Sequence, residues 1–181
     1  MTSSIDGSGS ATFATPLPAL QGGTSNATLP AAMIAMQAPA PVFSVFQNAS
    51  QTLVTGVLTK VSFTTKEFDS ANAFDIVTNL RFQPLVAGYY QLNGVARLQA
   101  TLMTSALISF FKNNAEYQRG AETNIPAFTG VLNLPINTVM FLNGSTDYVE
   151  LFVAAAGTSP MTVFTAQSLT SRLSGALVKP T

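Results

Sequence analysis

The sequence predicts an all-β sandwich or barrel preceded by an extended amino-terminal arm. From residue 42 onward, apolar residues alternate with polar ones at the two-residue period of a half-buried strand. No window sustains the helical period together with helix caps. Residues 1–41 are instead rich in Ala, Pro, Ser, Thr and Gly, a composition that cannot build a core of its own. We therefore divide the chain into an arm, residues 1–41, and a domain, residues 42–181.

The clearest strand covers residues 90–100. Its even positions carry Tyr90, Leu92, Ala96, Leu98 and Ala100, whereas its odd positions carry Gln91, Asn93, Arg97 and Gln99. Gly94 interrupts the apolar face, which predicts a bulge or a close approach of another segment. Val149, Leu151 and Val153 alternate in the same way with Tyr148, Glu150 and Phe152.

Shorter strand-like runs fill the rest of the domain. They are residues 42–47, 61–63, 106–112, 131–134, 139–142, 161–165 and 173–178. Turn-forming residues separate them at Asn113-Asn114, at Asn143-Gly144 and at residues 157–160. Eight or more strands in about 140 residues are typical of a sandwich or barrel.

The composition points to buried subunit contacts. Apolar residues make up 47% of the chain and charged residues only 9%, against roughly 25% in an average soluble domain. Thirteen Phe and four Tyr exceed what one small core comfortably hides. A membrane span is not predicted, because the longest apolar charge-free stretch, residues 29–46, is broken by Pro30, Pro39 and Pro41.

Charge and residue inventory exclude several functions. The net charge is zero and no cluster of Lys or Arg exists, so we expect no nucleic-acid or anionic-membrane partner. Without His or Cys, Ser-His-Asp triads, Cys-His dyads and zinc sites built from His or Cys are impossible. Glu67 and Asp69 share a strand face and Asp147 and Glu150 lie on opposite faces, but nothing indicates a cleft between carboxylates. We predict that the protein is not an enzyme.

The arm has its own pattern. Between Asp6 and Lys60 there is no Asp, Glu, Lys or Arg. Apolar side chains recur along it, at Phe13, Leu17, Leu20, Leu29, Met33, Ile34 and Met36. Residues 29–38 could form a short helix, although Pro and Gly favour extended chain. We favour an arm that docks on a partner; a passive linker is the alternative. The amino terminus lacks a signal-peptide pattern, so we expect release by lysis, as virus particles are released.

The segment 68–95, FDSANAFDIVTNLRFQPLVAGYYQLNGV, carries a family signature. Phe68, the segment 72–75, Phe82, Gly88 and Tyr90 stand in the spacing of C1q-like domains, which belong with the tumour-necrosis-factor jelly rolls. DYVEL at 147–151 and SGALV at 174–178 resemble that family's last two strands. The chain therefore resembles a C1q-like domain over residues 42–181, with Leu92 and Gly94 standing where the family usually has aromatic residues.

The resemblance implies a jelly roll of about ten strands in two sheets that forms a homotrimer about an apolar, aromatic axis. Candidates for the trimer interface are Tyr89, Phe111 and Phe152, which could alternatively fill the core. Some C1q-like trimers bind calcium, and Asp69, Asn72 and Asp75 could supply oxygen ligands. The alternative is an ordinary polar turn. No other cofactor is implied.

The Ala/Gly/Thr-rich composition and the absence of Cys make the chain similar to the versions of this domain that occur in bacteriophage structural proteins. This predicts a homotrimeric capsid decoration or head-fibre protein on the virion surface, made in the host cytoplasm and anchored by its arm to the major capsid protein or another virion protein. The alternative is a tail-fibre or spike knob that binds a host receptor or glycan. The sequence has no Trp for stacking on sugars, which disfavours the alternative.

Overall fold

The computed structural model describes residues 3–5, 11–13, 40–163 and 171–181, and the chain divides into two compact units, Met1–Pro39 and Ala40–Thr181. In the first unit, β1 (Ser3–Ile5) pairs antiparallel with β2 (Ala11–Phe13). Phe13, the first of the predicted docking residues, ends β2, but its side chain is not described. The other predicted docking residues and the alternative helix at 29–38 lie outside the described residues; these residues are Leu17, Leu20, Leu29, Met33, Ile34 and Met36.

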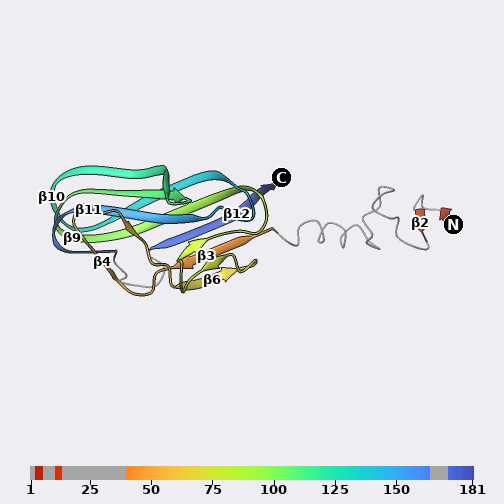
Figure 1. The fold of residues 1–181 in the computed structure, drawn as a ribbon, viewed down its shortest axis with the longest axis horizontal. Helices are drawn as coiled ribbons and strands as arrows, with labels where there is room; N and C mark the ends of the chain where they lie inside the picture. The colour runs from red at the N-terminus through yellow and green to blue at the C-terminus, as the bar shows by residue number, and fades with distance from the viewer. Residues whose placement is uncertain (1–2, 6–10, 14–39, 164–170) are drawn as a thin grey trace. The chain divides into compact units, whose positions relative to one another are not determined.

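The second unit is an all-β domain, as predicted (Figure 1). Its ten strands are β3 (Val42–Phe46), β4 (Gln51–Leu53), β5 (Thr59–Lys60), β6 (Thr65–Asp69), β7 (Phe74–Asp75), β8 (Arg81–Phe82), β9 (Gly88–Lys112), β10 (Ala115–Leu142), β11 (Val149–Val163) and β12 (Arg172–Pro180). They pair antiparallel in the order β6-β3-β12-β9-β11-β8-β7, with β10 on β9 and with β4 and β5 on β11. The described residues include no helix that could cross a membrane.

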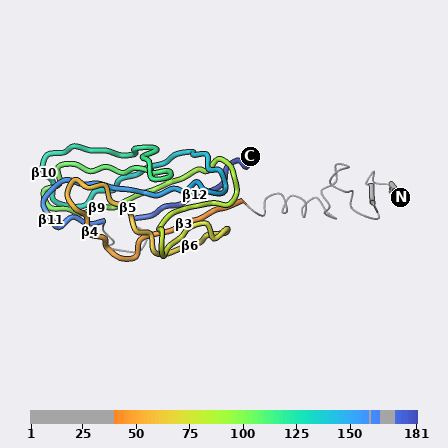
Figure 2. The backbone as a smooth tube through the Cα atoms, viewed as in Figure 1, coloured from red at the N-terminus to blue at the C-terminus, as the bar shows by residue number. Residues whose placement is uncertain are grey.

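The hairpin of β9 and β10 dominates the domain. Asn113 and Asn114 form its turn, both with positive φ, as a two-residue hairpin turn of the favoured type requires. At the start of β9, Tyr89 pairs with Phe141 of β10. At the other end of β9, Lys112 donates from Nζ to the carbonyl of the same Phe141 at 2.8 Å. The two ends of β9 therefore lie together, and the strand must double back between them (Figure 2).

The bend lies near the middle of both strands. Leu102 takes a φ of +50° in β9, and Gly130 takes +154° in β10. The β9–β10 register shifts on both sides of Phe128, next to this point. We call the end of the domain with Gly88 and Lys112 the base end, and the end with Leu102 and Gly130 the distal end.

Because β9 and β10 bend together, they belong to two layers. Layer A contains β6, β3, β12 and residues 88–100 and 130–142 of the hairpin. Layer B contains β5, β11 and residues 103–112 and 115–128 of the hairpin. β4 pairs with the last residues of β11, which also reach Gln99 and so cross to layer A at the distal end.

The core lies between the two layers. The predicted inward face of β9 is confirmed, because Tyr90, Leu92, Ala96, Leu98 and Ala100 are all buried. The predicted face of β11 is confirmed as well, since Val149, Leu151 and Val153 are buried. Tyr90 donates its hydroxyl to the carbonyl of Val86 at 2.7 Å, and burial raises the pKa of Tyr90 to about 12.

Gly94 marks a close approach of the layers, as predicted. A Cβ there would lie 3.0 Å from Cγ2 of Ile136 and 3.2 Å from Cδ1 of Leu151, which comes from the facing layer. No register shift occurs at Gly94, so the alternative of a bulge was wrong. The absent side chain makes room for Ile136 and Leu151.

Three other expectations need correction. The runs at 131–134 and 139–142 are parts of one strand, β10, which begins at Ala115. Residues 61–63 are not a strand, although Val61 and Phe63 are buried in the core. The predicted turn at 157–160 lies inside β11, at its register shifts. Residues 164–165, the end of another expected strand, lie outside the described residues.

Gly175 in β12 supplies a test of this packing. A Cβ there would lie 2.6 Å from Cδ2 of Leu92 and 2.7 Å from Cε1 of Phe43. We expect Gly175→Ala to lower the free energy of unfolding by about 1–3 kcal/mol, because overpacking a tight core forces its side chains to move. Urea denaturation measures the loss. Val178→Ala, on an exposed position of β12, should change stability by less than about 0.5 kcal/mol. Equal stabilities for the two variants would contradict the packing described here.

Candidate interaction surfaces

An aromatic pair lies on the outward face of layer A at the base end. The rings of Tyr89 and Phe141 have centroids 5.5 Å apart, and the two residues are 44% and 39% exposed. Val139, two residues before Phe141 on the same outward face of β10, is 52% exposed. These three residues form an apolar surface that no described segment covers. We call it the aromatic face.

The other two predicted interface residues lie elsewhere. Phe111 and Phe152 contact each other on the outward face of layer B, with ring centroids 4.2 Å apart and ring planes tilted by 36°, and both are half-buried. Beside them, buried Ser109 donates to Glu116 at 2.6 Å, and buried Glu150 pairs with Lys60 at 2.9 Å. Phe111 and Phe152 thus belong to a satellite cluster on a different layer from Tyr89. Their role in a trimer stays a prediction.

Phe141 is a candidate that the sequence alone did not yield. The Asn113-Asn114 turn suggests which residues of the hairpin face one another, but four register irregularities separate the turn from Tyr89. Each shift changes the pairing, so the partner of Tyr89 could not be counted from the turn.

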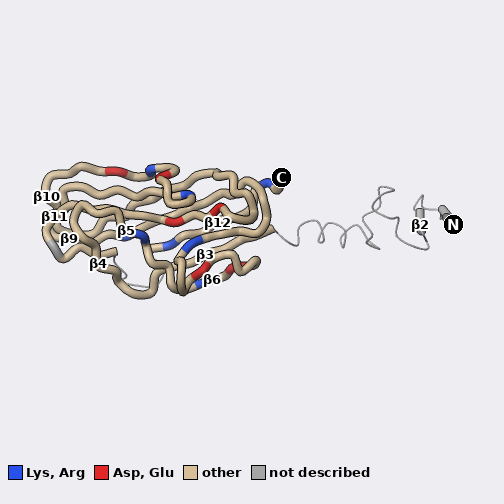
Figure 3. Tube along the Cα trace, in the orientation of Figure 1, with Lys and Arg blue, Asp and Glu red and all other residues tan. Residues whose placement is uncertain are grey.

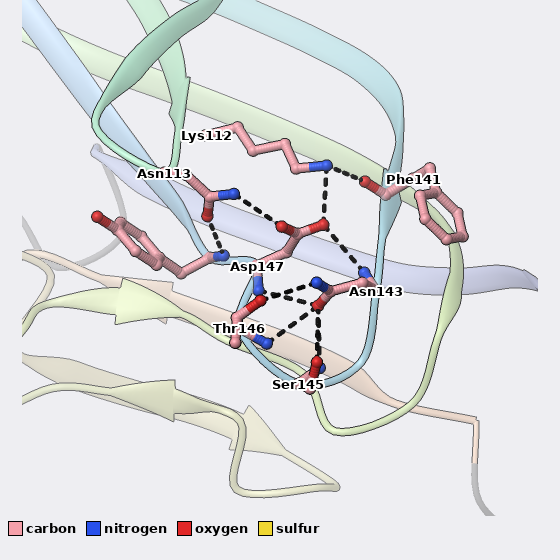
Figure 4. A network of polar contacts seen from close by, with 8 residues as sticks. Lys112, Asn113, Phe141, Asn143, Ser145, Thr146 and Asp147 are labelled. Atoms are coloured by element: carbon pink, nitrogen blue, oxygen red, sulfur yellow. Dashed lines mark hydrogen bonds and ion pairs between the residues drawn. The ribbon is translucent and has the colours of Figure 1, made fainter.

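A polar network ties two turns together at the base end (Figure 4). Asp147 accepts from Lys112 Nζ at 2.8 Å, from Asn113 Nδ2 at 2.7 Å and from the backbone N–H of Asn143 at 3.0 Å. The side-chain oxygen of Asn143 in turn accepts the backbone N–H groups of Ser145, Thr146 and Asp147, each at 3.0 Å. The network fixes the β10–β11 turn against the β9–β10 turn.

Asp147 is only 8% exposed. Burial by itself would raise the pKa of this carboxyl, but the hydrogen bonds from Lys112, Asn113 and Asn143 outweigh it and lower the pKa below its ordinary value. The carboxylate is therefore charged, and its described contacts join the β9–β10 turn to the β10–β11 turn.

The three candidate calcium ligands are used within their own loop. Asp69 accepts the backbone N–H groups of Ala73 and Phe74 and pairs with Lys66 at 2.8 Å. Lys66 also donates to the side-chain oxygen of Asn72 at 2.6 Å. Asp75 caps the next turn by accepting the backbone N–H groups of Val77, Thr78 and Asn79, which lower its pKa.

The Lys66 ammonium thus lies where a calcium ion between Asp69 and Asn72 would have to sit. Among the described residues, no three His, Cys, Asp or Glu side chains gather as a metal site. The geometry fits the alternative of a polar turn, and calcium binding stays a prediction.

The described acidic side chains all have structural partners. The ion pairs are Lys60–Glu150, Lys66–Asp69, Lys112–Asp147, Arg119–Glu116, Arg119–Glu122 and Arg172–Glu67. The remaining described carboxylate, Asp75, caps a turn. Glu67 and Asp69, which share one strand, have different partners, and so do Asp147 and Glu150. None of these carboxylates is paired with a second carboxylate in a way that would suggest acid–base chemistry.

The charges are unevenly distributed along the domain. Figure 3 shows them at the base end and along the middle, whereas the distal end carries none. Four stretches without Asp, Glu, Lys or Arg meet at that end: residues 48–59, 98–111, 123–146 and 151–163. The distal end therefore offers a ligand only hydrogen bonds and apolar contacts.

Comparison with known proteins identifies the fold. No protein-family profile and no curated protein sequence matches the chain. The structure is similar to the globular domain of the zebrafish complement 1qA protein, with a TM-score of 0.55 and 18% identity over 78% of this chain and 99% of that one. It is similar to Eiger TNF from S. frugiperda, with a TM-score of 0.57 and 8% identity over 78% of this chain and 93% of that one. It is also similar to murine APRIL in a crystal structure at pH 5.0, with a TM-score of 0.54 and 10% identity over 77% of this chain and 99% of that one.

These similarities show the fold alone, and they confirm the jelly roll that the signature at 68–95 predicted. The second unit is a C1q/tumour-necrosis-factor-like jelly roll. In its signature, Phe82 and Tyr90 are core residues, whereas Phe68 lies half-exposed on β6.

Asp147→Asn tests the base-end network. A lowered pKa in the folded state means that the carboxylate stabilises the protein above its unfolded pKa of about 3.9, and that this contribution is lost as the pH falls through the folded pKa. We expect the variant to be less stable by about 1–3 kcal/mol at pH 7, because buried donors lose their charged acceptor. The difference should shrink as the pH falls below the unfolded pKa of the carboxyl and through its lowered pKa in the folded state.

Thermal unfolding of both proteins between pH 2 and pH 7 provides the measurement. Glu122→Gln, which alters the exposed pair with Arg119 at 3.3 Å, is the matched control and should cost less than about 1 kcal/mol. A loss that is the same at pH 2 and pH 7 would show that the charge of Asp147 is not the cause.

Proposed function

We propose that the protein is a non-enzymatic, homotrimeric structural protein of a bacteriophage particle, a capsid decoration or head fibre anchored by its amino-terminal arm. The observation that carries the proposal is the aromatic face of Tyr89, Phe141 and Val139, an exposed apolar surface on a C1q/TNF-like jelly roll. The domain would project from the particle, and the arm would lie on the major capsid protein or another virion protein.

Self-association is supported by two features of layer A. Burying the aromatic face would contribute about 25 cal/mol for each Å² of apolar surface removed from water, before the cost of association. In addition, β10 pairs with β9 along one edge and with no other described strand over its 28 residues. Open edges of this length are normally protected. A neighbouring subunit on layer A would cover both the aromatic face and part of this edge.

Anchoring by the arm is supported by its sequence. The 53 residues between Asp6 and Lys60 hold no charged side chain, and the arm's apolar residues suit contact with a protein surface. A trimer carries three arms, so weak contacts of each arm would add up through effective concentration. Three-fold positions of an icosahedral shell would match such a trimer.

The trimer is tested by Tyr89→Ser combined with Phe141→Ser. We expect the parent chain to show three times its 19.0-kDa mass in light scattering, and the double variant to show the mass of one chain. Val77→Ser, in an exposed loop away from the aromatic face, is the control and should leave the trimer intact. A monomeric parent, or a double variant that stays trimeric and folded, would contradict the proposed interface.

The arm is tested by deleting residues 1–40. Because the second unit has its own core, we expect the shortened chain to remain a folded trimer and to lose its binding to purified particles. Co-sedimentation with capsids measures this, and retained binding would refute the docking arm.

Immunogold labelling of particles with antibody against residues 42–181 locates the protein. Label over the shell is expected, whereas label confined to the tail would favour a tail-fibre or spike knob.

A further inference from the structure

A hollow of about 340 Å³ opens on the uncharged distal end. Its polar lining comes from Ser50, Gln99, Thr101, Thr129 and Thr162, which lie on neighbouring segments around the β9–β10 bend. Pro160 forms part of its wall. This volume lies at the lower end of the range for small-molecule sites. We call it the distal hollow.

The chemistry of the lining is uniform. Four hydroxyl groups and one carboxamide each can donate and accept hydrogen bonds, and none of them titrates near neutral pH. The side chains of Gln99, Thr101 and Thr162 make no hydrogen bond within the described part of the chain. Thr129 accepts the backbone N–H of Leu102 at 3.0 Å, which orients its hydroxyl and leaves the O–H to donate. The distal hollow therefore presents hydrogen-bonding capacity that the protein itself does not use.

An exposed aromatic ring stands beside the distal hollow. A Cβ on Gly130, one of its lining residues, would lie 2.7 Å from Cζ of Phe128, so the ring covers that glycine. Phe128 is 40% exposed. A phenyl ring next to uncharged hydrogen-bonding groups suits a ligand with both an apolar C–H face and hydroxyl groups.

Another hollow of the domain is larger, but its polar groups are already bonded within the protein. It measures about 470 Å³ and lies beside the loop at 72–85. Its charged groups are already engaged, because Asp75 caps a turn, Lys66 pairs with Asp69, and Arg81 donates to Gln83 and lies over the ring of Tyr148. Its size alone does not make it the better site, since few of its polar groups remain for a ligand.

From these observations we propose that the distal hollow binds a neutral sugar unit of a glycan. The hydroxyl and amide groups of Gln99, Thr101 and Thr162 would bond the sugar hydroxyls, and Phe128 would contact its C–H face. The absence of charge over the whole distal end disfavours sialic or uronic acids, which a cationic site would recognise. This inference goes beyond the anchoring role and does not depend on it, because the arm and the distal hollow are separate parts of the chain.

The test uses saturation-transfer NMR on the full chain with methyl glycosides of glucose, galactose, mannose and N-acetylglucosamine, each at about millimolar concentration. Sialic acid and methyl glucuronide are the charged comparisons. We expect transfer to at least one neutral glycoside and none to the acids. Transfer to the acids alone, or to no glycoside, would overturn the proposal.

Variants then locate the site. Thr101→Val combined with Thr162→Val removes two hydroxyls at nearly constant shape, and Phe128→Ala removes the ring. We expect each to weaken binding about tenfold or more. Thr123→Val, on β10 outside the distal hollow, is the matched control and should bind as the parent does. Unchanged thermal unfolding shows that the variants are folded; if their affinity is then equal to the parent's, the distal hollow is not the site. Loss of particle binding in these variants is not expected, which keeps this test separate from that of the arm.

Discussion

The pairing of β9 with β10 is the constraint on which the other features depend. The two strands stay paired over most of their length while both bend at the distal end, so each contributes to both layers. The bend returns Lys112 to the carbonyl of Phe141, and it places the core between the layers. The hairpin supplies all of the aromatic face at one end and part of the lining of the distal hollow at the other, so both depend on its register and its bend.

The uneven distribution of charge gives the two ends different surface chemistry. Described carboxylates are held by ion pairs or turns, and at the base end Asp147 joins the turns that begin at Asn113 and Asn143. These contacts fix the two turns at the base end to each other. The distal end has only hydroxyl, amide and apolar groups, so any recognition there depends on shape and hydrogen bonds and is insensitive to salt. Anchoring and recognition would thus be separated along one domain.

Sequence patterns predicted the elements whose two faces meet different environments. The alternation at 90–100 gave the inward face of β9 because one face is core and the other is solvent. The first half of β10 was missed because none of its residues is buried, so no alternation marks Glu116 to Arg119. The pairing of Tyr89 with Phe141 was missed for a different reason, since bulges shift the register between the turn and that pair.

The sequence by itself determined the all-β class, the inward faces of β9 and β11, and the Asn113-Asn114 turn, because local periodicity and turn chemistry encode these directly. The resemblance of residues 68–95 to the C1q-like signature added the jelly-roll topology. It also determined that His and Cys chemistry is excluded. Only the tertiary structure decided that Phe111 and Phe152 lie on a different layer from Tyr89, that Lys66 occupies the space between Asp69 and Asn72, and that Gln99, Thr101 and Thr162 line one hollow. These are relations between segments far apart in the chain, fixed by the bend of the hairpin and by packing across the two layers.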